Sequence, residues 1–205
     1  MPGFTSIWPL PWPLRPDAPQ SPVVTAADLL ELLAGHVPDG PRESAALAST
    51  RRFLALTEAP FDRAADPTHV TASAIVAGPQ GTVLHVHKLS GQWLQPGGHI
   101  DADESPAEAA RRETLEETGV ACHHPVSGPL LLQVDEHTTA NEHTHLDLCY
   151  LLLTDDVALH PGEGESPSVR WFSWADAGQV ADECLASALG RAQRTLALIE
   201  PSRTH

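Results

Sequence analysis

The chain is poor in basic residues. Only 12 of its 205 residues are Lys or Arg, against 27 Asp or Glu, so the formal net charge is -15. A surface of this charge repels polyanions, and we therefore expect no binding to nucleic acid or to an anionic membrane. A small phosphorylated substrate is still compatible with this charge if a metal ion supplies positive charge locally.

Cysteines and long apolar runs are also scarce. Cys122, Cys149 and Cys184 are scattered without a CxxC pair, and an odd count argues against a disulfide framework. No apolar run approaches the roughly 20 residues of a membrane-spanning helix. The first residues lack the basic start and continuous apolar core of a signal peptide. These features predict reduced thiols and a cytoplasmic location.

Proline is concentrated at one end of the chain. Seven of the 19 prolines fall within residues 1–24, which predicts a polyproline-like or disordered tail. Trp8 and Trp12 in this tail are the basis of an alternative, a docking arm on a partner subunit.

The most informative stretch is 98–120. Ser105 as N-cap, Pro106 at the first helical position and Gly119 as a stop predict a helix between them. Glu108 stands where a capping-box partner would reach back to the N-cap.

Three carboxylates share one face of this helix. Glu113, Glu116 and Glu117 stand at i, i+3 and i+4, where like charges repel each other. A hard divalent ion such as Mg2+ takes oxygen ligands and would remove that repulsion. A solvated acidic face is the alternative interpretation.

The spacing of the stretch carries a resemblance to a known family. The pattern G-x5-E-x7-R-E-U-x-E-E-x-G-U, the Nudix box, is matched by Gly98, Glu104, Arg112, Glu113, Glu116, Glu117, Gly119 and Val120. One position departs, because Thr114 stands where a bulky aliphatic residue is usual, and it affects packing rather than the acidic face. The chain therefore resembles the Nudix hydrolases.

The resemblance implies a fold and an activity. The fold is an α/β/α sandwich with a mixed β-sheet. The activity is Mg2+- or Mn2+-dependent hydrolysis of a diphosphate linkage in a nucleoside diphosphate derivative or nucleoside triphosphate, by water attack on phosphorus. The alternative is a Nudix-like module that binds a nucleotide or nucleotide-sugar without cleaving it. Because all the box carboxylates are present, we favour the hydrolase.

The resemblance also implies roles for the residues. Glu113, Glu116 and Glu117, with the carbonyl of Gly97, would bind the metal. Arg112 would orient the box carboxylates, Glu104 among them, and a free arginine finger on phosphate is the alternative role. Glu104 is interpreted as a support rather than a ligand. The general base stays open: Glu113 is favoured within the box, and the candidates outside it are Glu136, Glu142, Glu163 and Glu165.

A second polar cluster follows the box. His143, His145 and Asp147 recur at period two and lie on one side of an expected strand. We predict that they line the substrate pocket with His99 and Trp93. A plain polar surface and a separate transition-metal site are the alternatives.

The remaining pattern organises the chain into a helical extension at 25–65 and a Nudix domain at 66–205. Helices are expected at 25–36, 41–58 and 181–200, and strands at 69–78, 82–88, 129–136, 145–154 and 168–174. The extension is open to three roles: packing on the domain, forming a homodimer, or capping the pocket. The substrate is not readable from the sequence.

Overall fold

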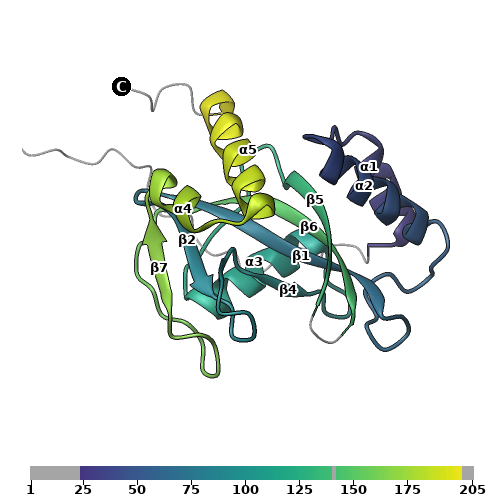
Figure 1. Cartoon of the computed structure of the whole chain (residues 1–205), viewed down its shortest axis with the longest axis horizontal. Helices are drawn as coiled ribbons and strands as arrows, with labels where there is room; N and C mark the ends of the chain where they lie inside the picture. Colours follow the sequence, from purple (N-terminus) through teal and green to yellow (C-terminus); the bar gives the residue numbers. More distant parts are fainter. Residues whose placement is uncertain (1–23, 140–141, 200–205) are drawn as a thin grey trace, which may run out of the picture.

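A mixed β-sheet carries helices on both of its faces (Figure 1). This computed structural model describes residues 24–139 and 142–199. The strands are β1 (Thr68–Gly78), β2 (Gly81–Val86), β3 (Trp93–Leu94), β4 (Gly97–His99), β5 (Leu130–Thr138), β6 (Thr144–Leu153) and β7 (Val169–Phe172). The helices are α1 (Ala26–Ala34), α2 (Pro41–Leu54), α3 (Pro106–Thr118), α4 (Trp174–Val180) and α5 (Glu183–Ile199). The predicted α/β sandwich is confirmed, whereas residues 1–23 of the predicted tail lie outside the described residues.

The sheet is built around two parallel strands. Its order is β3-β2-β1-β6-β5, with β4 paired to β1 and β7 paired to β2. β1 and β6 run side by side from Thr68 opposite Thr144 to Ala77 opposite Leu153. Both strands are covered on each face, which explains their long apolar runs.

Alternate side chains of β1 serve two different layers. Val70 belongs to the core that is shared with α1, α2 and α3. Ile75 points the other way and belongs to the core that is shared with α5. Three polar residues precede Ile75 on the same face of β1. They are Ser73, Thr71 and His69, and all three are buried. These polar residues contribute to the site described below.

Helix α3 begins and ends at the predicted residues. Ser105 Oγ accepts a hydrogen bond of 3.2 Å from the amide of Glu108, and Gly119 ends the helix at φ 75°. A Cβ at Gly119 would lie 2.3 Å from the carbonyl oxygen of His160, so the space also requires glycine. The reciprocal half of the predicted capping box is absent, because the Glu108 carboxylate accepts from Arg111 instead, at 3.1 Å.

The unusual box residue Thr114 is accommodated within the helix. Its side chain is fully buried, and its hydroxyl donates to the carbonyl of Ala110 at 2.7 Å. The buried hydroxyl is therefore satisfied where an aliphatic side chain is usual.

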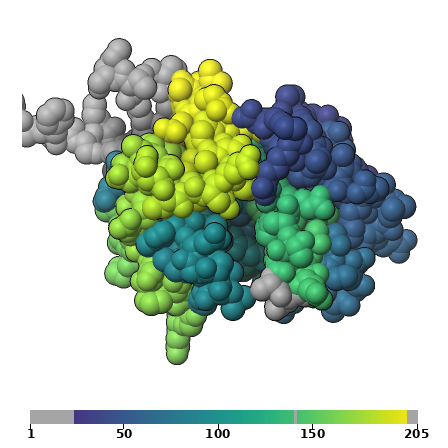
Figure 2. Space-filling model, viewed as in Figure 1, coloured from purple at the N-terminus to yellow at the C-terminus, as the bar shows by residue number. Residues whose placement is uncertain are grey.

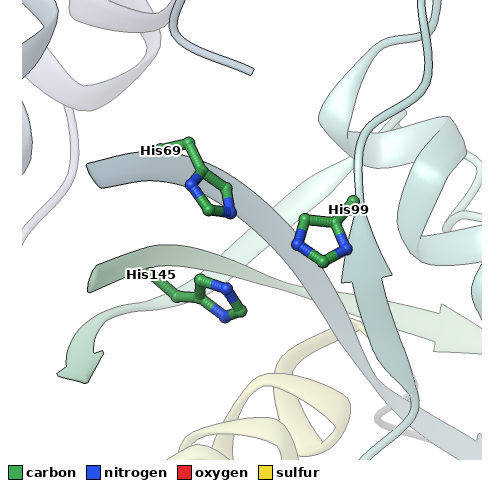
Figure 3. A group of neighbouring side chains, drawn as sticks. All are labelled: His69, His99 and His145. Carbon is green, nitrogen blue, oxygen red and sulfur yellow. The ribbon is translucent and has the colours of Figure 1, made fainter. Parts of the chain in front are cut away.

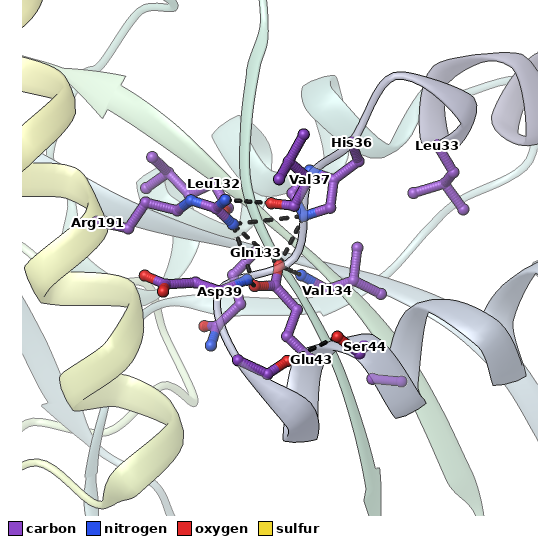
Figure 4. A network of polar contacts seen from close by, with 12 residues as sticks. Leu33, His36, Val37, Asp39, Glu43, Ser44, Leu132, Gln133, Val134 and Arg191 are labelled. Carbon is purple, nitrogen blue, oxygen red and sulfur yellow. Dashed lines mark hydrogen bonds and ion pairs between the residues drawn. The ribbon is translucent and has the colours of Figure 1, made fainter.

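The N-terminal helices are tied to the domain by a buried acid (Figure 4). Glu43 on α2 is 2% exposed. Its carboxylate accepts from Nε2 of His36 at 2.6 Å, from the amide of Val134 on β5 at 3.0 Å, and from Nη1 of Arg191 on α5 at 3.1 Å. One carboxylate thus joins α2, the sheet and α5, and the extension packs directly on the domain.

Several element boundaries differ from the prediction. Helix α2 ends at Leu54 rather than at residue 58. The predicted strand 168–174 ends at Phe172, because Ser173 caps a new helix by accepting from the amide of Asp176 at 3.1 Å. The expected terminal helix 181–200 is α5, and the short α4 that precedes it was missed. No described helix is both long and apolar enough to cross a membrane.

Candidate active site

Arg112 lies at the centre of the Nudix box. Its side chain donates hydrogen bonds to acceptors from three parts of the chain. Its guanidinium donates to Glu104 at 3.0 Å, to Glu113 at 2.9 Å and to Glu116 at 3.1 Å. It also donates to the carbonyl oxygen of His99 at 2.8 Å. Burial alone would lower the pKa of Arg112, but the bonds to Glu104 and Glu113 raise it. All three guanidinium nitrogens are engaged, which leaves Arg112 in a positioning role rather than as a free phosphate ligand.

Glu117 faces away from Arg112. Its Oε2 accepts a hydrogen bond of 2.9 Å from the amide of Gly97 and lies 3.6 Å from Nε2 of His85 on β2. Burial raises the pKa of Glu117 to about 8 and lowers the pKa of His85 to about 4. The raised pKa of Glu117 and the lowered pKa of His85 each favour the neutral form of the group, so burial disfavours an ion pair between them.

The Gly-Gly turn allows strand, turn and helix to approach closely. A Cβ at Gly98 would lie 2.6 Å from Oε1 of Glu113, and one at Gly97 would lie 2.5 Å from the Cβ of Ser73 on β1. At Gly97 the backbone of β1 leaves no room for a side chain, and at Gly98 a side chain would displace the Glu113 carboxylate. Because Gly97 and Gly98 carry no side chains, β4 can lie against β1 and the Glu113 carboxylate can lie against the turn.

The chemistry of these donors fits a hard divalent cation. Glu113 and Glu117 are mostly buried acids whose pKa values are raised, chiefly by burial. A cation would remove that electrostatic cost, and oxygen ligands suit Mg2+ or Mn2+. In the described structure Arg112 holds Glu113 and Glu116, while Glu117 turns to Gly97.

A cavity of about 850 Å3 opens beside the turn. Figure 2 shows the surface hollowed between the teal segment around β2 to β4 and the green segment of β5 and β6. Its lining includes residues from strands β1 to β6 and from α2, among them Arg42, Thr71, Ser73, His85, Gly97, Gly98, His99, Asp135, His137, His143, His145 and Asp147. Glu117 contacts two of these residues, Gly97 and His85, which places the box acids at the cavity wall.

Four of the five predicted pocket residues line the cavity: His99, His143, His145 and Asp147. Trp93 is the exception and corrects our prediction. Its ring packs against Phe172 with 4.9 Å between centroids, in the core under α5. Apolar packing on β7 holds the indole away from the cavity lining.

Asp147 does not share the surroundings of His143 and His145. Its carboxylate accepts from Oγ1 of Thr71 at 2.8 Å and from Oγ of Ser73. Both partners are on β1, the neighbouring strand. The Asp147 carboxylate is therefore satisfied by two hydroxyl donors of β1.

The cavity also holds a cation that sequence reasoning missed. Arg42 on α2 donates to Oδ1 of Asp135 at 2.9 Å, and His137 lies 3.1 Å from Oδ2 of the same acid. Burial would raise the pKa of Asp135, but its bonds to His137 and Arg42 lower it to about 2. The helical extension thus contributes two cations to the pocket, Arg42 and Arg63, and only the packing of α2 on β5 could have revealed the position of Arg42.

The candidate general bases are placed very differently. Glu136, Glu142 and Glu163 are exposed. Glu165 is half-buried and pairs with Lys88 at 2.8 Å, and its charge contributes to the raised pKa of Glu117. Its loop is anchored to the box helix, since the amide of Gly162 donates to the carbonyl of Glu116 at 2.7 Å. Of the four candidate bases outside the box, Glu165 is the one whose charge acts on a box glutamate.

Comparisons with known proteins identify the family and the fold. A family model described as NUDIX domain matches residues 67–191. Phosphatase NudJ of Escherichia coli (strain K12) is 45% identical over 56 residues, which are 26% of this chain and 36% of that protein. The chain thus spans little more than a third of the length of the curated relatives it matches.

Solved structures show the same fold. A NUDIX-family hydrolase from Clostridium perfringens is 27% identical with a TM-score of 0.54, covering 64% of this chain and 98% of that one. A MutT NUDIX hydrolase from Burkholderia pseudomallei is 26% identical with a TM-score of 0.51, covering 60% and 97%. The NUDIX domain of Shewanella oneidensis NrtR, complexed with ADP ribose, is similar in fold at 23% identity and a TM-score of 0.53, covering 71% and 97%. With a family model that covers more than half of its length, this chain belongs to the Nudix hydrolase family.

Proposed function

We propose that the protein hydrolyses a diphosphate linkage in a nucleoside diphosphate derivative or nucleoside triphosphate, with Mg2+ or Mn2+ as cofactor. The observation that carries the proposal is the contact of Glu117 with Gly97 and His85, which brings a desolvated box acid to the wall of the cavity. The intact set of box carboxylates supports hydrolysis over binding alone.

Glu113, Glu116 and Glu117 would hold the metal, with the carbonyl of Gly97 as a further ligand. When bound, the ion supplies Lewis-acid stabilisation of phosphoryl oxygens and lowers the pKa of a coordinated water. Arg112 holds Glu113 and Glu116 in place, and Glu104 in turn fixes Arg112. The protein's own contribution is thus a group of oxygen donors on one helix, two of them held by Arg112.

We assign removal of the proton from the attacking water to Glu165. Glu113 is the alternative, but Nη1 of Arg112 holds one of its oxygens at 2.9 Å. Glu165 pairs only with the half-exposed Lys88, and a surface pair of this kind constrains a carboxylate weakly. The loop that carries Glu165 is hydrogen-bonded to the end of the box helix, which keeps the Glu165 side chain close to the box.

The cavity is suited to a small phosphorylated molecule. Arg42 and Arg63 line it and would attract phosphate oxygens that the metal does not neutralise. A net charge of -15 disfavours long polyanions, so we propose a small-molecule substrate rather than nucleic acid. The pairing of Glu43 with Arg191 supports packing as one role of the extension, and Arg42 adds a second role in the pocket.

The decisive experiment measures phosphate or nucleotide release from a panel of nucleoside diphosphate compounds and triphosphates with Mg2+ or Mn2+. We expect wild type to cleave at least one compound, and Glu117→Gln to lose at least about 100-fold in kcat, a rise of roughly 2.7 kcal/mol in the activation barrier. The exposed Glu58→Gln is the matched control and should retain full activity. Binding of one panel member without cleavage by wild type would instead support the non-hydrolysing module.

A further inference from the structure

Three histidines from three neighbouring strands meet at one end of the sheet (Figure 3). They are His69 on β1, His99 on β4 and His145 on β6, and each has a ring nitrogen within 4.8 Å of those of the others. Across residues 24–139 and 142–199, no other three His, Cys, Asp or Glu side chains bring their ligand atoms so close. The box glutamates of the described structure do not form such a set.

Strand pairing explains why the three rings share one face. His145 lies directly opposite His69 in the parallel register of β1 and β6. His99 lies opposite Thr71, which is two residues from His69 and therefore on the same face of β1. The convergence is thus built into the backbone of the sheet rather than into a loop.

The surroundings of His69 indicate that the histidine cluster binds a ligand. Its side chain is fully buried, and neither of its ring nitrogens has a hydrogen-bond partner among the described residues. A buried polar group without a hydrogen-bond partner destabilises the folded state. A ligand bound between the three rings would satisfy a nitrogen that the protein itself leaves without a partner.

We propose that His69, His99 and His145 bind a divalent transition-metal ion of the zinc class, at a site separate from the acids of the box. Imidazole nitrogens suit Zn2+, Co2+ or Ni2+, whereas the box offers oxygen donors that suit Mg2+ and Mn2+. Three histidines with a fourth position left open are a common zinc arrangement. Tetrahedral zinc at ~2.0 Å from each nitrogen places ligand atoms about 3.3 Å apart, so the rings need only turn toward a common point.

The open position of this ion would face the cavity, since His99 and His145 both line it. His143, whose ring centroid is 5.5 Å from that of His69, is the neighbouring side chain that could complete the coordination. The site is also connected to the box, because Arg112 donates to the carbonyl oxygen of His99 at 2.8 Å. The inference goes beyond the proposed hydrolysis and does not depend on it.

The test is a metal titration of the full chain after removal of metals with a chelator. Zn2+ is titrated calorimetrically in the presence of saturating Mg2+, and Co2+ is followed by visible absorption, which reports low coordination number and nitrogen ligands. We expect one Zn2+ per chain. His145→Gln and His69→Phe should each lower the affinity by more than ~100-fold, beyond what loss of a supporting residue costs.

Two control variants locate the ion. His123→Gln changes an exposed histidine outside the cluster and should bind Zn2+ like wild type. Glu117→Gln should also keep Zn2+ binding while it loses hydrolysis, which separates this site from the box. His145 is only half-buried, so its variant should fold even if His69→Phe does not.

Three results would overturn the proposal. The first is no Zn2+ uptake by wild type, and the second is wild-type affinity in His145→Gln. The third is loss of Zn2+ binding in Glu117→Gln, which would place the ion at the box. A parallel titration of the metal-free protein with inorganic phosphate checks the competing explanation, and phosphate binding that His145→Gln abolishes, without Zn2+ uptake, would make the cluster an anion site instead.

Discussion

The amide of Gly97 donates a hydrogen bond of 2.9 Å to Oε2 of Glu117, a residue 20 positions further along the chain. This bond joins the glycine turn on the sheet to the last glutamate of the box helix. It fixes the carboxylate beside His85 and the cavity, where burial raises the pKa of Glu117 to about 8. The turn and the helix therefore act as one unit, and changes in either should alter the same carboxylates.

Gly98→Ala should reduce activity with little loss of stability. The added Cβ would meet Oε1 of Glu113 at 2.6 Å, and the flexible carboxylate would move away from its position beside Arg112. We expect a fall in kcat of about 10-fold or more, since small displacements of reacting groups are costly. Gly35→Ala is the control, because nothing lies within 4 Å of its Cβ. Equal kcat for both variants would refute the steric argument.

Arg112→Lys should behave as a disruptive change despite conserving the charge. Lysine cannot reproduce the planar fork that reaches Glu104, Glu113 and Glu116 together. We expect ~10–100-fold weaker activation by Mg2+, the typical cost of losing a residue that supports metal ligands. The measurement is kcat as a function of Mg2+ concentration. Arg52→Lys, which changes an exposed arginine, should show the wild-type curve.

Glu165→Gln and Glu163→Gln form a matched pair on one loop. Loss of a general base typically costs 10²–10⁴-fold in rate, and we expect that loss for Glu165 alone, with little change in KM. Glu163 is exposed and should be replaceable without effect. A pH profile of kcat supports the assignment if the acidic limb present in wild type disappears in Glu165→Gln. Unchanged kcat in Glu165→Gln would return the role to Glu113.

Glu43→Gln should destabilise the protein by about 3 kcal/mol, at the low end for breaking a buried ion pair, because Arg191 is partly exposed. We also expect the stabilisation that Glu43 contributes to depend on pH. Burial would raise the pKa of Glu43, but bonds from His36 and from the amides of Asp39 and Val134 lower it below 4.5.

A folded-state pKa below the unfolded value makes the stabilisation complete above about pH 4.5, and it is lost as the pH falls through the folded pKa. The difference in unfolding free energy between wild type and Glu43→Gln should therefore shrink on acidification. Urea unfolding at neutral pH and below pH 4.5 measures it. Glu31→Gln, on the exposed side of α1, is the control, and a pH-independent difference would contradict the linkage.

Local residue order was enough to predict the box helix and its acidic face. Ser105, Pro106 and Gly119 set its limits, and helical periodicity alone puts Glu113 and Glu117 on one side. The strands followed from their apolar runs in the same way. Such features depend on neighbours within a few residues, and these are visible in a single sequence.

The tertiary structure decided which distant side chains share the cavity. Arg42 meets Asp135 across 93 residues, and His69 joins His145 only because β1 and β6 pair in parallel with that register. Trp93 shows the converse, since packing against Phe172 removed a predicted pocket residue. Strand order and register depend on the summed packing of the whole core, so no local pattern specifies them, whereas a helix face is set by the 3.6-residue period of its own segment.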